Sequence, residues 1–214
     1  MMYQSLENFS LRKINYVKTR TTILKTVANL LKQESFADIT VDEICQKAQI
    51  SRGTFFNYFP TKEHIFHYYL RIFTIRIALR MKELPEGLTF HDKVEKIYEW
   101  FRDDKQYAYF FNNFINFILN VGEKANEMKL IDAEFVYFFN GITEEEYAAY
   151  NELTLGELFS EVCESASKKG EITLEGSKET LSSILIGTLS AAYISDIVSS
   201  ENNYLSTFEK IWYK

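Results

Sequence analysis

The chain has 214 residues, enough for one mid-sized globular unit or two small domains. Hydrophobic residues make up 46% and charged residues 25%, which excludes a disordered polar tail and a chain that lies mostly in a membrane. Only 2 Pro and 8 Gly are present, too few for the closely spaced turns of β-sandwiches and barrels, so an all-α fold is predicted.

Cysteine and apolar patterning bear on where the protein works. Cys45 and Cys163 lie in different halves of the chain and form no CxxC or Cys/His group, so neither a disulfide framework nor a zinc site is predicted. No apolar run approaches the roughly 18 residues of a membrane span, and the first residues lack the basic-then-apolar pattern of a signal peptide. We therefore expect a cytoplasmic protein with no membrane partner.

The net charge of −6 is divided unevenly along the chain. Residues 1–62 hold 9 Lys and Arg against 5 Asp and Glu, a balance of +4, whereas residues 63–214 hold 15 against 25, a balance of −10. Small windows also fluctuate in charge by chance. Motifs must therefore decide whether the basic end contacts phosphate.

The first two predicted helices lie before residue 49. Between Lys18 and Gln33, apolar residues recur every three or four positions, which predicts a helix. Thr40 begins the next helix through a capping box, in which the Thr40 hydroxyl and the Glu43 carboxylate bond to each other's free backbone amides. This second helix is predicted to run to about Ala48.

Two further helices follow after short interruptions. Ser51 caps a third helix, and Pro60 disfavours helical geometry just before it, so this helix is barely two turns long. Thr61 caps a fourth helix of about 20 residues, which ends before Pro85.

The remaining chain predicts five or six helices, giving about nine or ten in total. Breaks are expected near Asp103, Gly122, Gly141, Asn151 and residues 170–176. The apolar run Phe135–Phe139 is compatible with a helix or a strand, and we predict a helix.

Two short helices joined by a tight turn are typical of a helix-turn-helix. The first helix of such a motif braces the second, whose N-terminal residues point at base edges in the major groove. The predicted core positions are Val41, Ile44, Cys45, Ala48, Ile50, Phe55 and Phe59. This assignment leaves a set of polar or small residues facing outward: Arg52, Gly53, Thr54, Asn57 and Tyr58.

The outward residues suit contact with double-stranded DNA. Arg52 can donate two hydrogen bonds to O6 and N7 of guanine, and Asn57 can pair with a base or a phosphate. The hydroxyls of Thr54 and Tyr58 can donate to phosphates. Lys62 adds a phosphate contact beside the N-terminal amides of the following helix.

The segment ITVDEICQKAQISRGTFFNYFPTKEHIF resembles the helix-turn-helix of TetR-type transcriptional regulators, and the resemblance extends upstream through TRTTILKTVANLLKQESFADIT. It covers the chain from Thr19 to Tyr69, while the remainder resembles the family only in helix count and length. The resemblance implies two kinds of DNA contact: phosphate contacts by Thr40, Tyr58 and Lys62, and base or backbone contacts by Arg52, Gly53 and Thr54.

Two positions depart from the family pattern. The family usually has Tyr, whose hydroxyl contacts phosphate, where Phe56 stands, so that contact is missing or altered here. It usually has Gly where Gln49 stands, so Gln49 must tolerate a left-handed backbone conformation. Phe56 and the capping residue Ser51 remain among the predicted DNA-binding residues.

The same residues are compatible with alternatives to DNA binding. A similar trio of helices occurs in proteins that never touch DNA, and a helix-turn-helix protein without an effector is the main alternative. A small helical enzyme is a further one, but His64 and His67 lack a third ligand nearby, and no nucleophile is paired with a base. We therefore expect no enzyme activity, no cofactor and no metal.

An aromatic stripe at helical spacing runs through Tyr107, Phe110, Phe111, Phe114 and Phe117. Core packing explains such a stripe, but TetR-type proteins hold an effector among helices 4 to 7, where the same residues would line a pocket for a largely apolar ligand. Other predicted pocket residues are Phe73, Trp100 and Phe101. The acidic balance of this half favours a neutral or cationic effector.

Small residues recur between Leu181 and Ile197 and permit close approach of another helix. Residues 155–166 and 181–197 would form a two-fold four-helix bundle, as the resemblance also implies, although a helix buried within one chain gives the same pattern. We predict a homodimeric, ligand-responsive repressor that binds an inverted-repeat operator and is released by a small-molecule effector. Its helix-turn-helix domain would span residues 1–62, and its effector and dimerisation domain residues 63–214.

Overall fold

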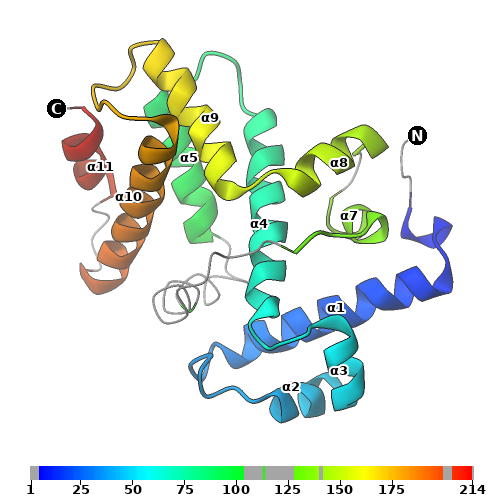
Figure 1. The fold of residues 1–214 in the computed structure, drawn as a ribbon. Helices are drawn as coiled ribbons and strands as arrows, with labels where there is room; N and C mark the ends of the chain where they lie inside the picture. Colours follow the sequence, from blue (N-terminus) through cyan, green and yellow to red (C-terminus); the bar gives the residue numbers. More distant parts are fainter. Residues whose placement is uncertain (1–4, 104–112, 114–127, 140–141, 200–203, 214) are drawn as a thin grey trace. The chain divides into compact units, whose positions relative to one another are not determined.

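The computed structural model describes residues 5–103, 113, 128–139, 142–199 and 204–213 (Figure 1). These residues contain ten α-helices, so the predicted all-α fold is confirmed. They form two compact units, one from the described residues of 1–76 and 104–152, the other from those of 77–103 and 153–214. Among the described residues, no helix is both long and apolar enough to span a membrane.

The first unit combines N-terminal helices with helices from the middle of the chain. It contains a short 3-10 helix, η1 (Leu6–Asn8), followed by α1 (Leu11–Leu30), α2 (Val41–Ala48), α3 (Arg52–Tyr58), the first part of α4 (His64–Lys82), α7 (Asp132–Phe138) and α8 (Glu144–Glu152). Helix α2 packs against both α1 and α3, and α7 packs against α1 and η1 (Figure 1). Residues far apart in sequence therefore build this unit.

Helix α1 starts and ends earlier than predicted. The Ser10 hydroxyl accepts a hydrogen bond from the Lys13 amide at 3.4 Å, which caps the helix and moves its start from Lys18 to Leu11. Its end lies at Leu30 rather than Gln33. The Ser10 cap was overlooked because no Glu or Gln stands at Lys13 to complete a capping box.

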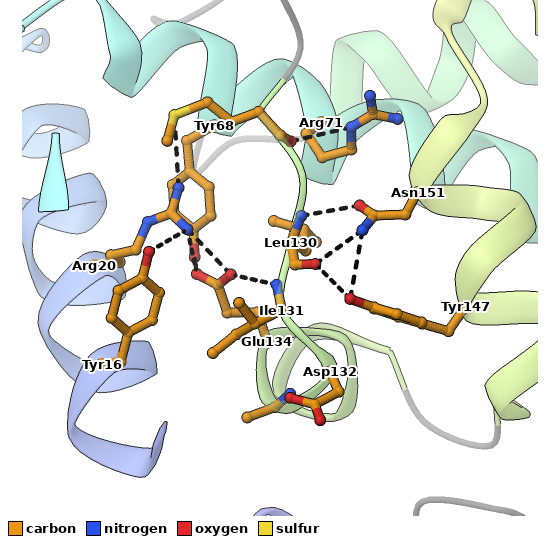
Figure 2. Close-up of polar contacts among 12 residues, drawn as sticks. Tyr16, Arg20, Tyr68, Arg71, Leu130, Ile131, Asp132, Glu134, Tyr147 and Asn151 are labelled. Atoms are coloured by element: carbon orange, nitrogen blue, oxygen red, sulfur yellow. Dashed lines mark hydrogen bonds and ion pairs between the residues drawn. The ribbon is translucent and has the colours of Figure 1, made fainter. Parts of the chain in front are cut away.

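A charged cluster lies buried at the centre of the first unit (Figure 2). Arg20 of α1 pairs with Glu134 of α7 at 3.0 Å, and the two side chains are 1% and 0% exposed. The Glu134 carboxylate also accepts hydrogen bonds from the Tyr68 hydroxyl at 2.7 Å and the Ile131 amide at 2.9 Å. The Arg20 guanidinium lies over the Tyr68 ring at 3.9 Å, so α1, α4 and α7 meet in this cluster.

The segment that leads into α7 is held by polar side chains from α4 and α8 (Figure 2). Asn151 bonds to both the amide and the carbonyl of Leu130, each at 2.9 Å, and the Tyr147 hydroxyl donates to the same carbonyl. Arg71 donates from Nε to the Met128 carbonyl at 3.1 Å. These bonds satisfy backbone groups of a segment that makes no helical hydrogen bonds of its own and whose Leu130 is buried.

The second unit contains the last residues of α4 together with α5 (Phe90–Asp103), α9 (Leu155–Lys168), α10 (Lys178–Ser199) and α11 (Tyr204–Trp212). Helix α10 packs along α9 and α11, and α5 also contacts α9. Phe90, Phe208 and Trp212 form a buried aromatic group between α5 and α11. The predicted break near residue 170 is present, where Gly170 adopts a positive φ of 67° after α9.

Two further expectations can be compared with the structure. Residues 135–138 of the run Phe135–Phe139 lie in helix α7, as predicted, whereas Phe139 follows the helix in an extended conformation. The predicted functional division after residue 62 stays a prediction, whereas the compact units divide the chain differently because residues 128–152 pack with the N-terminal helices.

Candidate nucleic-acid interface

The turn between α2 and α3 is short and tightly bonded. Gln49 adopts a left-handed conformation (φ 56°, ψ 44°), as expected for a residue standing where glycine is usual. The Ile50 amide donates to the Cys45 carbonyl at 3.0 Å, which closes the end of α2. Ser51 then caps α3 by accepting from the Thr54 amide at 3.0 Å, so only three residues separate α2 from α3.

The N-terminus of α2 follows the predicted cap only in part. The Thr40 hydroxyl accepts from the Glu43 amide at 3.1 Å, as predicted. The Glu43 carboxylate does not complete the capping box; it pairs with Lys47 at 3.1 Å, one turn along the helix. The ion pair at i,i+4 is the competing interaction that replaces the reciprocal bond.

Helix α3 has one buried and one exposed face. Phe55 and Phe59 are fully buried, and Ile44, Cys45 and Ala48 of α2 are buried with them, while Val41 and Ile50 are only half-buried. The outer face of α3 exposes the side chains of Arg52, Phe56 and Asn57 and the backbone of Gly53. A Cβ added at Gly53 would meet only the Ser51 hydroxyl, at 3.8 Å, so packing within the chain does not require glycine there.

Arg52 makes a specific contact with α2 that sequence reasoning missed. Its Nη1 donates to both carboxylate oxygens of Asp42, at 2.7 and 2.8 Å. Its guanidinium carbon lies 6.0 Å from the ring centroid of Phe56, whose side chain is 43% exposed. Asp42 precedes Arg52 by ten residues, a separation with no helical periodicity, so no local sequence pattern indicated the pair.

Several hydroxyls predicted to contact phosphate already serve the fold. Those of Thr40 and Ser51 accept from backbone amides, but an accepting hydroxyl still has a proton to donate. The Ser51 and Thr54 hydroxyls also bond to each other at 2.9 Å, which uses one of their two protons. Tyr58 is half-buried, and its ring centroid lies 5.0 Å from that of Tyr16 on α1.

The Lys62 ammonium lies on backbone carbonyls of the loop between α1 and α2. It donates to the carbonyls of Phe36 and Ile39, both at 2.7 Å, and more weakly to that of Ala37 at 3.4 Å. Burial lowers the pKa of Lys62 below its ordinary value. The structure thus gives Lys62 a role in holding this loop, and its phosphate contact stays a prediction.

The buried cluster of Arg20, Tyr68 and Glu134 also contacts aromatic residues next to α3. Arg20 donates to the Tyr16 hydroxyl at 3.3 Å and lies 5.1 Å from the ring centroid of Phe59, the last residue before Pro60. Tyr16 in turn contacts Tyr58 at the end of α3. We call Tyr16, Tyr58 and Phe59 the aromatic layer beneath α3. Arg20 contacts this layer and also pairs with Glu134 on α7.

The predicted effector residues fall partly outside the described residues. Tyr107, Phe110, Phe111, Phe114 and Phe117 all lie there. Phe73 is buried on α4, and Phe101 is buried on α5 in the second unit. Trp100 is half-buried beneath the Arg80 guanidinium at 5.6 Å. Their role in a pocket stays a prediction.

Comparison with known proteins finds similarity centred on the helix-turn-helix. Residues 23–69 match the family model described as bacterial regulatory proteins, tetR family. The chain is 51% identical over 43 residues to the HTH-type transcriptional regulator EthR of Mycobacterium tuberculosis, a match that covers 20% of each chain. It is 30% identical over 122 residues to the uncharacterized HTH-type transcriptional regulator YdgC of Bacillus subtilis, covering 53% of this chain and 59% of that relative. These matches thus span between a fifth and about three fifths of the relatives' length.

Solved structures resemble the chain over most of its length. GusR of Salmonella enterica superposes with a TM-score of 0.58 at 17% identity, covering 91% of this chain and 93% of that one. FadR of Thermus thermophilus, a TetR-family transcriptional repressor solved in complex with lauroyl-CoA, has a TM-score of 0.56 at 19% identity and covers 90% and 91%. At such identities the likeness concerns the fold.

Proposed function

The chain belongs to the TetR family through its helix-turn-helix segment, and on that premise we propose that it is a homodimeric transcriptional repressor whose DNA binding responds to a small molecule. The observation that carries this proposal is the outer face of α3, where Arg52, Gly53, Phe56 and Asn57 are exposed at the end of a tight turn. An exposed face of this kind on a second helix is what enters the major groove in helix-turn-helix proteins.

Base reading would centre on Arg52 and Asn57. The Arg52 guanidinium can donate two hydrogen bonds to guanine, and Asn57 can pair with adenine or a phosphate. The missing side chain of Gly53 permits close approach of the backbone to DNA. Phe56 has no hydroxyl for a phosphate, but its exposed ring can contact a thymine methyl group.

Phosphate contacts would surround this reading face. The Thr40 hydroxyl accepts from an amide and keeps its own proton to donate to a phosphate, and the Ser51 and Thr54 pair keeps one. Tyr58 adds a phenolic hydroxyl at the end of α3. Such contacts would position the protein without reading sequence.

A dimer interface on α9 and α10 is supported by the surface of α10. Its packed face contacts α9, while Gly187, Ala191 and Ile194 lie on another face and are exposed, Ile194 by 46%. Residues at this spacing form one stripe along a helix, and small residues allow another helix to approach closely. Residues 155–166 and 181–197 would therefore contribute two helices per protomer to a four-helix bundle.

Response to an effector would follow from linkage. If a ligand favours a spacing of the two α3 helices that differs from the one DNA favours, it must weaken DNA binding by the same factor by which DNA weakens ligand binding. Helix α4 is the proposed lever, since it starts just after Lys62 and continues past Phe73. FadR of similar fold was solved with lauroyl-CoA, and a largely apolar effector also suits the aromatic residues of this chain.

The proposal is tested by selecting DNA from a random pool with the purified full chain. We expect an inverted repeat, a dimer by light scattering at micromolar concentration, and loss of preference at one position per half-site in Arg52→Ala, at a cost of about 1 to 3 kcal/mol. A single unrepeated motif or a monomer would contradict the dimer. Bound complexes are then challenged with neutral and cationic apolar compounds, with lauroyl-CoA as the anionic comparison. DNA binding that no compound alters would favour a helix-turn-helix protein without an effector.

A further inference from the structure

Arg52 is the cation on the exposed face of α3, and its side chain is held in one direction. An arginine side chain loses rotamer entropy when it is fixed, so a side chain that is free before binding has a larger entropy cost on contact with DNA. Here the Asp42 carboxylate receives Nη1 through both of its oxygens, at 2.7 and 2.8 Å. Both side chains are largely exposed, at 60% for Arg52 and 68% for Asp42, so burial does not account for the pair.

We propose that Asp42 is a positioning residue for base recognition, which holds Arg52 so that the free edge of its guanidinium faces the bases. This inference rests on the proposed DNA-binding function. In this role Asp42 makes no base contact of its own; both of its oxygens accept from Nη1.

The atoms that remain free favour positioning over blocking. A guanidinium can receive a guanine along the edge formed by Nε and Nη2, which matches O6 and N7. Asp42 engages only Nη1, and within the described part of the chain Nε and Nη2 make no hydrogen bond. A contact that kept Arg52 away from DNA would instead have to cover this edge. The Phe56 ring, 6.0 Å away, borders the guanidinium on another side.

The charge of Asp42 supports the same conclusion. A carboxylate on a surface that meets phosphates repels them and lowers affinity for every sequence. When Asp42 pairs with Arg52, its charge still lowers the affinity for all DNA, but the pair holds the arginine in a fixed direction. The protein would thus bind DNA more weakly in general and discriminate better between sequences. The charge effect and the positioning effect therefore have opposite signatures, and one set of variants separates them.

The experiment uses the DNA site that the wild-type full chain selects, together with sites changed at single positions. Dissociation constants are measured at one salt concentration for wild type, Asp42→Asn, Arg52→Ala, the double variant, and Glu43→Gln as a control. Glu43 is the matched control because it lies next to Asp42 in the first turn of α2 but pairs with Lys47.

Positioning predicts a loss of discrimination confined to the position that Arg52 reads. Exposed ion pairs of this kind are worth about two- to fivefold, so preference for the selected base pair should fall about two- to fivefold when one half-site is changed and about 4- to 25-fold when both are. Asp42→Asn should tighten binding to unrelated DNA, as should Glu43→Gln, because each removes one negative charge. In the Arg52→Ala background, Asp42→Asn should leave base preference unchanged.

Other outcomes overturn the inference. If Asp42→Asn tightens binding to all sequences equally, as Glu43→Gln does, Asp42 contributes charge alone. If it strengthens binding to the selected site while sharpening preference, Asp42 blocks Arg52 rather than positioning it. If the wild-type chain retains no sequence from the pool, the proposed function itself fails, and that result is distinct because it precedes any variant.

Discussion

Replacing Glu134 with alanine should strongly destabilise the first unit. The variant would leave the Arg20 guanidinium, 1% exposed, without its counter-ion, and breaking a buried ion pair in this way costs about 3 to 5 kcal/mol. The Tyr68 hydroxyl would also lose its acceptor, at about 1 to 3 kcal/mol. We therefore expect a loss near the upper end, about 5 kcal/mol, against a total stability of about 5 to 15 kcal/mol for a typical domain.

The assay is urea unfolding followed by far-UV circular dichroism, with Glu134→Gln as a milder variant that keeps an acceptor for Tyr68. Asp132→Asn is the matched control, because Asp132 also joins α7 to α1, through Lys13 at 2.6 Å, but the two side chains are 24% and 46% exposed. This exposed pair should be worth at most about 1 kcal/mol. Replacing both Arg20 and Glu134 with methionine should cost less than Glu134→Ala, because no charge is left buried. Equal losses for Glu134→Ala and Asp132→Asn would refute the reasoning.

Three further changes test separate features. Burial, and then the Glu134 charge, raise the pKa of Tyr68 well above its ordinary value of 10.0, so its contribution to stability is full below that pH and is lost as the pH rises through the folded-state pKa. Above pH 10.0, the free energy of unfolding of the wild type should therefore fall faster than that of Tyr68→Phe, by up to about 1.4 kcal/mol per pH unit; parallel curves would contradict this. Lys62→Met should lower the free energy of unfolding by about 2 kcal/mol, because the ammonium donates to loop carbonyls. Unchanged stability, together with a salt dependence of DNA binding that is shallower by about one log–log unit per half-site, would instead assign Lys62 to a phosphate contact. Gln49→Gly should raise the free energy of unfolding, measured by thermal denaturation, by about 1 kcal/mol, because glycine adopts the left-handed conformation without strain. An unchanged free energy would mean that Gln49 is unstrained.

Local interactions in the helix-turn-helix were predictable from the sequence. The caps at Thr40 and Ser51 depend on neighbours three positions away, and the structure has both. The left-handed conformation of Gln49 was expected from the family resemblance, and it is present too. The buried faces of α2 and α3 followed from apolar spacing in the same way.

Interactions between distant residues were not predictable. Arg20 and Glu134 are 114 residues apart, and each reads in the sequence as an ordinary surface charge. Asp42 and Arg52 meet only because the turn folds α3 back toward α2. The Lys62 ammonium likewise finds carbonyls 23 to 26 residues upstream, where the sequence pattern suggested a phosphate. The partners of these side chains are set by tertiary contacts, which cannot be inferred from a single sequence.

The discontinuous first unit also sets an order of events during synthesis. Glu134 emerges from the ribosome 114 residues after Arg20, so at about 5 to 20 residues per second the guanidinium waits about 6 to 23 s for its counter-ion. Over that interval α1, α2 and α3 can form their local hydrogen bonds. The Arg20 guanidinium, which contacts the aromatic layer beneath α3, still lacks its partner Glu134. We expect α3 to become rigid only after Glu134 has been made and has paired with Arg20. A chain terminated before Glu134 would then carry the helix-turn-helix sequence without the buried ion pair that joins α1 to α7.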